Sequence, residues 1–252
     1  MRAGPTTDEQ GNHASAHPHP NPPPTVEGAI QAMTTALRFD LIVFDWDGTL
    51  FDSTALIVRC IQDACRDVGT AVPNDTDAAY VIGLGLADAL RHAAPDLPAE
   101  RYGELGLRYR HHYFASQHEL SLFPGTLEML QALKARHHWL AVATGKGRRG
   151  LDDALAHTQL EGLFDASRTA DETASKPDPR MLNELMREFG TEPERTLMIG
   201  DTTHDLQLAR NAGTPRVAVS YGAHDHQSFA GFEPLTIAHS TRELHDWLLV
   251  HG

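Results

Sequence analysis

From Pro124 to the C-terminus, the sequence alternates between strand and helix patterns, and this alternation constrains the fold more than any other feature. Short apolar runs predict strands at 140–143, near 165–168, at 196–199 and at 217–219. Helical periodicity predicts helices at 126–136, 149–156, 179–189, 203–211 and 241–250. Strands that alternate with helices usually pair in parallel, with helices on both faces of the sheet. We therefore predict an α/β fold with a doubly wound parallel sheet.

The first strand of this sheet is predicted earlier in the chain, at 41–44, and a long stretch without strands separates it from the others. That stretch has helical patterns at 53–69, 76–82, 86–93 and 99–117. We interpret it as a helical domain inserted into the sheet domain. The predicted boundaries are 37–54 and 122–252 for the core and 55–121 for the inserted cap.

Residues 1–36 are rich in proline, histidine and glycine and contain almost no large apolar side chains. This composition is typical of a disordered segment. Met33 stands just before the predicted core and is a candidate for the true start of the protein.

The net charge of −13 argues against nucleic-acid and anionic-membrane partners, because both would be repelled at long range. No apolar run approaches the roughly 18 residues of a membrane span, and the N-terminus lacks the apolar segment of a secretory signal. The two cysteines, Cys60 and Cys65, cannot form a disulfide framework or a four-ligand zinc site. We predict a cytoplasmic protein, monomeric or homodimeric, that acts on a small molecule.

Two aspartates, Asp45 and Asp47, follow the first predicted strand. In an extended chain they would point the same way and repel each other, and Gly48 permits an immediate turn. At the carboxyl end of a central strand, such a pair can supply a nucleophile, a proton carrier and ligands for Mg²⁺. A strand followed by a plain Asp-Gly turn is the simpler alternative.

The ends of the other predicted strands also carry polar groups. Asp45 and Asp47 would be joined there by Thr144-Gly145-Lys146, Lys176, Asp201 and Asp205. Each alone has a structural explanation, such as a helix N-cap or a solvated loop cation. Their occurrence in order at successive strand ends indicates one shared crevice.

In these positions the chain, from about Phe39 onward, resembles the haloacid dehalogenase-like phosphohydrolases, and within them the phosphoglycolate phosphatase and β-phosphoglucomutase branch. The four motifs of that family appear as Asp45-Trp46-Asp47-Gly48-Thr49, Thr144, Lys176, and Gly200-Asp201 with Asp205. The resemblance implies a Rossmann-like core with an inserted helical cap. It also implies a phosphatase that acts on a small phosphorylated metabolite, with phosphoglycolate as the first candidate.

Catalytic roles follow from the resemblance and from the residue types. Asp45 would attack phosphorus to form an aspartyl phosphate, and Asp47 would protonate the leaving alkoxide and then activate water. Thr144, the N–H of Gly145, Lys146 and Lys176 would bind the substrate, and Thr144 and Lys176 would also stabilise the phosphoryl charge.

The metal predicted at this site is Mg²⁺. Its ligands would be Asp45, Asp47 through the backbone carbonyl, and Asp201, with Asp205 orienting bound water.

Three alternatives stay open at this point. A phosphosugar mutase of the β-phosphoglucomutase type uses the same core, and a catalytically inactive binding protein could retain the fold. The segment 145–150 reads G-x-G-x-x-G with Asp165 twenty residues after Gly145, which formally fits a dinucleotide-binding oxidoreductase. A haloacid dehalogenase proper is disfavoured, because displacement of halide from carbon does not need the acid at Asp47. The loop 83–86 is the segment of the cap predicted to face the site and select the substrate.

Overall fold

A computed structural model describes Met1 and residues 38–252, so the predicted tail at 1–36 and the alternative start at Met33 lie outside the described residues. In the described part the chain forms one six-stranded sheet in the order β3-β2-β1-β4-β5-β6, and all neighbouring strands run parallel. The strands are β1 (Leu41–Phe44), β2 (Trp139–Thr144), β3 (Ala166–Thr169), β4 (Thr196–Gly200), β5 (Arg216–Val219) and β6 (Ile237–Ala238).

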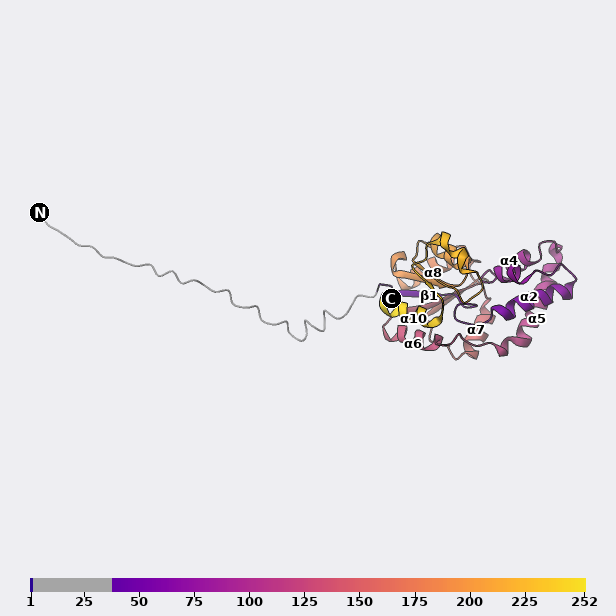
Figure 1. Ribbon diagram of the computed structural model, residues 1–252, viewed down its shortest axis with the longest axis horizontal. Coiled ribbons are helices and arrows are strands. Elements are labelled where there is room, and N and C mark those ends of the chain that lie inside the picture. The colour runs from indigo at the N-terminus through magenta and orange to yellow at the C-terminus, as the bar shows by residue number, and fades with distance from the viewer. Residues whose placement is uncertain (2–37) are drawn as a thin grey trace. The chain divides into compact units, whose positions relative to one another are not determined.

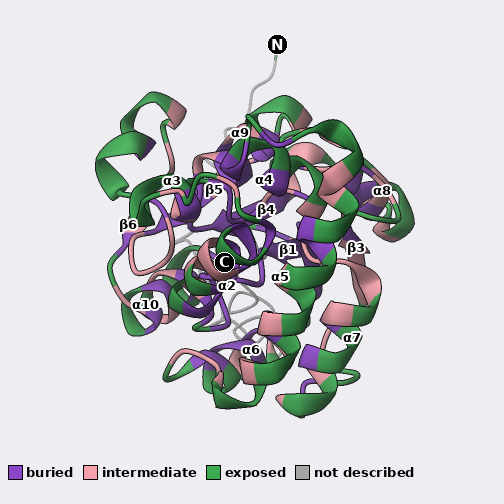
Figure 2. Ribbon diagram, turned by 90° about the vertical axis from the view of Figure 1, so that its right-hand side faces the viewer, coloured by how far each residue is buried: buried purple, intermediate pink, exposed green. Residues whose placement is uncertain are grey.

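Alternate side chains of β1 pack on opposite faces of the sheet, as the period of a strand requires. Ile42 and Phe44 belong to an apolar cluster with α6 (Thr126–Ala135), α7 (Arg148–His157) and α10 (Thr241–His251). Leu41 and Val43 belong to a second cluster with α8 (Arg180–Phe189) and α9 (Thr203–Ala212). Figure 2 shows the buried strands at the centre and the exposed faces of these helices outside. The doubly wound α/β prediction is therefore confirmed.

The segment between β1 and α6 is helical and has an apolar cluster of its own. It contains α2 (Thr54–Val68), α3 (Asp75–Tyr80), α4 (Leu86–Ala93) and α5 (Tyr102–Ser116). Their buried side chains, from Leu56 on α2 to Tyr113 on α5, pack on one another. Figure 1 shows α2, α4 and α5 grouped beyond one end of β1, while α6, α8 and α10 surround the strand. This is the inserted cap; its boundaries at 55 and 121 stay a prediction.

The strands and helices expected from the sequence are present within one or two residues at most ends. Three elements were missed: the two-residue edge strand β6 and the 3-10 helices η3 (Pro193–Arg195) and η4 (His226–Phe232). Short 3-10 turns also occupy Ala99–Arg101 and Gln117–Glu119. Among the described residues, none of the helices combines the length and apolar character that crossing a bilayer requires.

Candidate active site

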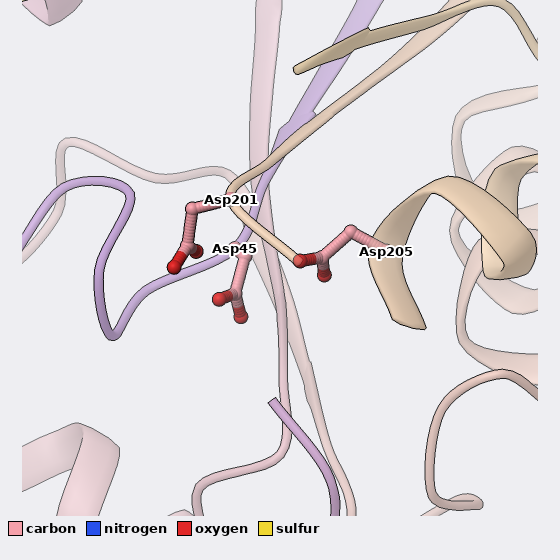
Figure 3. Close-up of side chains that lie close together, drawn as sticks. All are labelled: Asp45, Asp201 and Asp205. Atoms are coloured by element: carbon pink, nitrogen blue, oxygen red, sulfur yellow. The ribbon is translucent and has the colours of Figure 1, made fainter. Parts of the chain in front are cut away.

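The central position of β1, between β2 and β4, determines where the polar loops meet. Asp45 follows β1 directly, Asp201 follows β4, and Asp205 lies in the first turn of α9. Because the strands are parallel, their carboxyl ends lie at one edge of the sheet. Figure 3 shows the three carboxylates converging there, with that of Asp205 directed from its helix toward the other two. One oxygen from each lies within 4.8 Å of the others, and all three residues are buried.

Neighbouring groups hold two of these carboxylates in place. The Thr49 hydroxyl donates to Asp201 at 2.8 Å, and the backbone N–H of Ala223 donates to its other oxygen at 2.7 Å. Asp205 accepts from the backbone N–H and the hydroxyl of Thr202, at 3.0 and 2.6 Å, in a capping box that begins α9. The same contacts that start the helix therefore orient the carboxylate of Asp205.

Gly48 has a backbone φ of +86°, and a β-carbon there would lie 2.2 Å from a carboxylate oxygen of Asp201. Only glycine allows this turn to bring the loop after β1 against the loop after β4.

Lys176 is the cation of this acidic group. Its ammonium donates to Asp45 Oδ1 and to Asp205 Oδ1, both at 2.6 Å, and the side chain is fully buried. Burial alone would lower the pKa of Lys176, but Asp205 and Asp45 more than offset it and hold the pKa above its usual value. Lys176 is therefore a fixed positive charge between the two carboxylates.

The single positive charge of Lys176 does not offset the negative charge that three carboxylates can carry. Burial raises the pKa of Asp45 well above its usual value, although Lys176 opposes the shift, and Asp205 and Asp201 add to it. Burial and the neighbouring Asp205 raise the pKa of Asp201 to about 7. Asp45 Oδ2 is buried and has no hydrogen-bond partner among the described residues. A hard divalent cation held by oxygen ligands would satisfy this oxygen and the excess charge, so the residues present fit Mg²⁺.

Asp47 faces another set of partners. It accepts from the Ser53 hydroxyl at 2.8 Å through Oδ1, and its Oδ2 lies 3.1 Å from the ammonium of Lys146. Its carboxylate is not one of the three that cluster. The two aspartates of the first motif thus have separate surroundings, as a nucleophile and a proton carrier would require.

The predicted residues at the end of β2, Thr144 to Lys146, lie beside the cap. The Thr144 hydroxyl accepts from the backbone N–H of Lys146 at 3.1 Å, which tightens the turn. A β-carbon on Gly145 would lie 2.3 Å from the carbonyl oxygen of Leu84 and 2.4 Å from that of Gly83. The cap loop predicted to face the site therefore does so, and it packs directly on the backbone of Gly145.

A cavity of about 580 Å³ lies between this loop and the strand ends. Asp45, Asp47 and Thr144 line it, whereas Lys176, Asp201 and Asp205 are not among its lining residues. The carboxylates of Asp45 and Asp47 thus face a bound molecule, and the charged groups that surround Asp45 lie behind it.

The cap also contacts the core around the acidic group. Nε2 of His204 and Nε2 of His224 lie 2.8 and 3.0 Å from the backbone carbonyl of Tyr80, at the end of α3. Burial lowers the pKa of both imidazoles, so both rings are neutral near pH 7. Sequence reasoning missed His224, since a lone histidine in a loop carries no signal of this contact.

The dinucleotide interpretation of 145–150 is wrong on geometry. Asp165 immediately precedes β3, so it lies at the amino end of that strand, while Gly145 lies at the carboxyl end of β2. These ends face opposite edges of a parallel sheet. Asp165 is also engaged, accepting from the Leu140 backbone N–H at 2.9 Å and from the Lys134 ammonium at 2.7 Å.

The chain is similar to known proteins over most of its length. Residues 42–219, which include every candidate residue named above from Asp45 to Asp205, match the family model of haloacid dehalogenase-like hydrolases. The phosphoglycolate phosphatase of Aliivibrio fischeri is 33% identical over 204 residues, covering 77% of this chain and 89% of that protein. Pyrophosphatase PpaX of Halalkalibacterium halodurans is 28% identical over 212 residues, covering 83% and 97%. The crystal structure of a predicted phosphoglycolate phosphatase from Haemophilus somnus has a TM-score of 0.76 at 27% identity, covering 86% of this chain and 100% of that one.

Proposed function

This chain belongs to the haloacid dehalogenase-like hydrolases and is a phosphatase, and we propose that it hydrolyses a small phosphate monoester through an aspartyl phosphate on Asp45 with the help of Mg²⁺. The observation that carries the proposal is the split between Asp45 and Asp47. Both line the cavity, yet one is set among buried charges and the other faces Ser53 and Lys146.

In the first step, a carboxylate oxygen of Asp45 bonds to phosphorus as the bond from phosphorus to the ester oxygen breaks. Asp47 gives its proton to that oxygen, and the alcohol leaves. Water then attacks phosphorus, Asp47 takes a proton from it, and inorganic phosphate leaves as Asp45 is regenerated. Atoms and charge balance over the two steps without an oxidant or a further co-reactant.

The other groups support this exchange. The ammonium of Lys176, 2.6 Å from Asp45 Oδ1, keeps the nucleophile oriented and offsets charge as the phosphoryl group arrives. Thr144 and the N–H of Gly145, at the end of β2, would donate to phosphoryl oxygens. Asp45, Asp201 and the backbone carbonyl of Asp47 would hold Mg²⁺, with Asp205 orienting a bound water. When bound, Mg²⁺ supplies the positive charge that lets an anionic nucleophile meet an anionic substrate.

Phosphoglycolate is the first substrate to test, because relatives bear the name phosphoglycolate phosphatase. The test is phosphate release from a panel of phosphometabolites, with Mg²⁺ and after its removal by EDTA. We expect release that requires Mg²⁺ and is absent in Asp45→Asn. Release by Asp45→Asn at the wild-type rate would refute the role of Asp45.

The mutase alternative gives a distinct result in the same panel. A mutase would convert a sugar 1-phosphate to its 6-phosphate while releasing little inorganic phosphate. A cytoplasmic location and a monomeric or homodimeric state also stay predictions.

A further inference from the structure

The inner wall of the cavity carries two tyrosines of the cap beside the lysine that contacts Asp47. Tyr109 and Tyr113 are one turn apart on α5, and their rings stack with centroids 6.0 Å apart. The ammonium of Lys146 lies 4.5 Å from the centroid of the Tyr113 ring and donates to the Tyr113 hydroxyl at 3.1 Å. The cap and the proton carrier Asp47 therefore meet at one partly buried cation, Lys146.

This group has more hydrogen-bond donors than partners. An ammonium has three N–H donors, and those of Lys146 have two partners, Asp47 and the Tyr113 hydroxyl. The Tyr113 hydroxyl accepts from Lys146, so its own proton is free to be donated. The Tyr109 hydroxyl has no hydrogen-bond partner among residues 38–252. Burial raises the pKa of both phenols, so both stay protonated at neutral pH.

The remaining cap wall of the cavity is mostly aliphatic. Its side chains come from α2, the end of α3, the loop before α4, and α4 itself: Ile57, Ile61, Val81, Ile82, Leu84, Leu86 and Leu90. At about 580 Å³ the cavity lies within the range of pockets that enclose whole organic ligands. Glycolate, a two-carbon acid, is much smaller than such ligands.

This inference rests on the proposed function, and it concerns the chemical class of the leaving group. We propose that the substrate is the phosphate ester of a 2-hydroxy acid with an apolar substituent, whose carboxylate is bound by Lys146, Tyr109 and Tyr113. Asp47 protonates the ester oxygen, and the Lys146 ammonium lies 3.1 Å from Asp47. A group on the carbon that bears this oxygen therefore lies next to the cation and the two hydroxyls.

Each part of such an acid has a complementary surface. The carboxylate accepts charge-assisted hydrogen bonds from the three unused donors. The substituent on the same carbon removes aliphatic surface from water against the cap wall. A sugar would instead place several hydroxyls against the aliphatic part of that wall, where each buried hydroxyl without a partner costs free energy.

A substrate series tests the proposal on the full-length protein with Mg²⁺. The esters are phosphoglycolate, O-phospholactate, the phosphate of 2-hydroxy-4-methylpentanoate, and 2-hydroxyethyl phosphate, which lacks the carboxylate. We expect kcat/KM to rise about fourfold per added methylene. We expect 2-hydroxyethyl phosphate to be at least about tenfold poorer than phosphoglycolate, because it lacks the charge-assisted bonds.

Variants locate the carboxylate site. Tyr109→Phe and Tyr113→Phe should each raise KM for the carboxylate esters about tenfold, and should raise KM for 2-hydroxyethyl phosphate by a smaller factor. Tyr102→Phe is the matched control, because Tyr102 lies on the same helix and donates to the Ala94 carbonyl at 2.7 Å, away from this wall. Arg110→Met tests a competing cation, since Arg110 also lines the cavity; we expect the carboxylate preference to survive it.

The outcomes separate this inference from the proposed function. If the esters are hydrolysed with Mg²⁺ but without preference for a carboxylate or an apolar substituent, the inference is overturned and the phosphatase proposal stands. Loss of the preference in Arg110→Met, but not in the tyrosine variants, also overturns it. If none of the esters nor p-nitrophenyl phosphate is hydrolysed, both proposals fail.

Discussion

The two lysines of the site, the buried Lys176 and the partly buried Lys146, each contact a catalytic aspartate but differ in where their other partner comes from. Lys176 contacts only carboxylates of the core, Asp45 and Asp205. Lys146 contacts one core carboxylate, Asp47, and one hydroxyl of the cap, Tyr113. Both have a raised pKa despite burial, because their partners outweigh the loss of solvation.

Because their partners differ, the two lysines are suited to different tasks. The surroundings of Lys176 are complete within the sheet domain, so the charge at the nucleophile does not depend on the cap. The surroundings of Lys146 are complete only when the cap lies on the core. We infer that phosphoryl transfer is set by the core, and the choice of leaving group by the contact between the two domains.

The largest expected effect is on the core side. Asp45→Asn should lower kcat by at least about 10⁴-fold, because an amide cannot form the covalent intermediate. The fold should survive, since burial and the neighbouring carboxylates already disfavour the charge on Asp45. Steady-state kinetics and thermal unfolding of the metal-free protein test both points. The control is Asp178→Asn on the surface, where Asp178 pairs with Arg180. A similar loss of kcat in that variant would show that the effect is not specific to the nucleophile.

The second prediction compares the lysines directly. Lys176→Met leaves two buried carboxylates without their cation and should lower the free energy of unfolding by about 3–5 kcal/mol near neutral pH. Lys146→Met should cost less than half of that, because Asp47 keeps the Ser53 hydroxyl and its side chain is 11% exposed, against 1% for Asp45 and 0% for Asp205. Urea denaturation of both variants gives the comparison. Equal losses of unfolding free energy in the two variants would show that the surroundings of the two lysines do not differ in this way.

Contact between the domains gives the third prediction. Gly145→Ala places a β-carbon 2.3 Å from the Leu84 carbonyl oxygen, so the cap loop must move away. We expect kcat/KM to fall roughly 100-fold through misplacement of the leaving group. In Gly103→Ala, the matched control, the added β-carbon has no atom within 4 Å. Unchanged kcat/KM in Gly145→Ala would mean that this contact does not matter for catalysis.

Per unit of pH, the smallest effect is a pH dependence of stability on the core side. The pKa of Asp201 is about 7 in the folded protein, against about 3.9 in an unfolded chain. Between these values the folded state binds more protons, so this residue makes stability fall as pH rises, by at most about 1.4 kcal/mol per pH unit. Urea denaturation of the metal-free wild type and Asp201→Asn, from about pH 4 to about pH 8, isolates this contribution. The advantage of the wild type over the variant should shrink with rising pH; a constant difference would contradict the assignment.

The positions of the core site could be predicted from the sequence, whereas those of the cap tyrosines could not. Asp45, Thr144 and Asp201 each follow a strand that its apolar run makes recognisable, and parallel strands bring those positions together. No such rule predicts Tyr109 or Tyr113. Their spacing places them on one face of a helix, but only the packing of the cap on the core decides which face meets Lys146.

Residues that act across elements were missed for the same reason. Ser53 immediately precedes α2, where a serine reads as a helix cap, yet its side chain makes no cap hydrogen bond and donates to Asp47 instead. Asp165 is the opposite case: its spacing from Gly145 suggested a functional residue where the structure has none. Spacing alone does not say at which end of a strand a residue lies.

Acid quenching during turnover, followed by mass spectrometry of the peptide that contains Asp45, would detect the covalent intermediate itself. Asp47→Asn should accumulate the phosphorylated peptide with p-nitrophenyl phosphate, whose leaving group needs no acid, because the water that clears the intermediate lacks its base. We expect a phosphoryl group on Asp45. Continued phosphate release with no label on Asp45, or with the label on another residue, would contradict it.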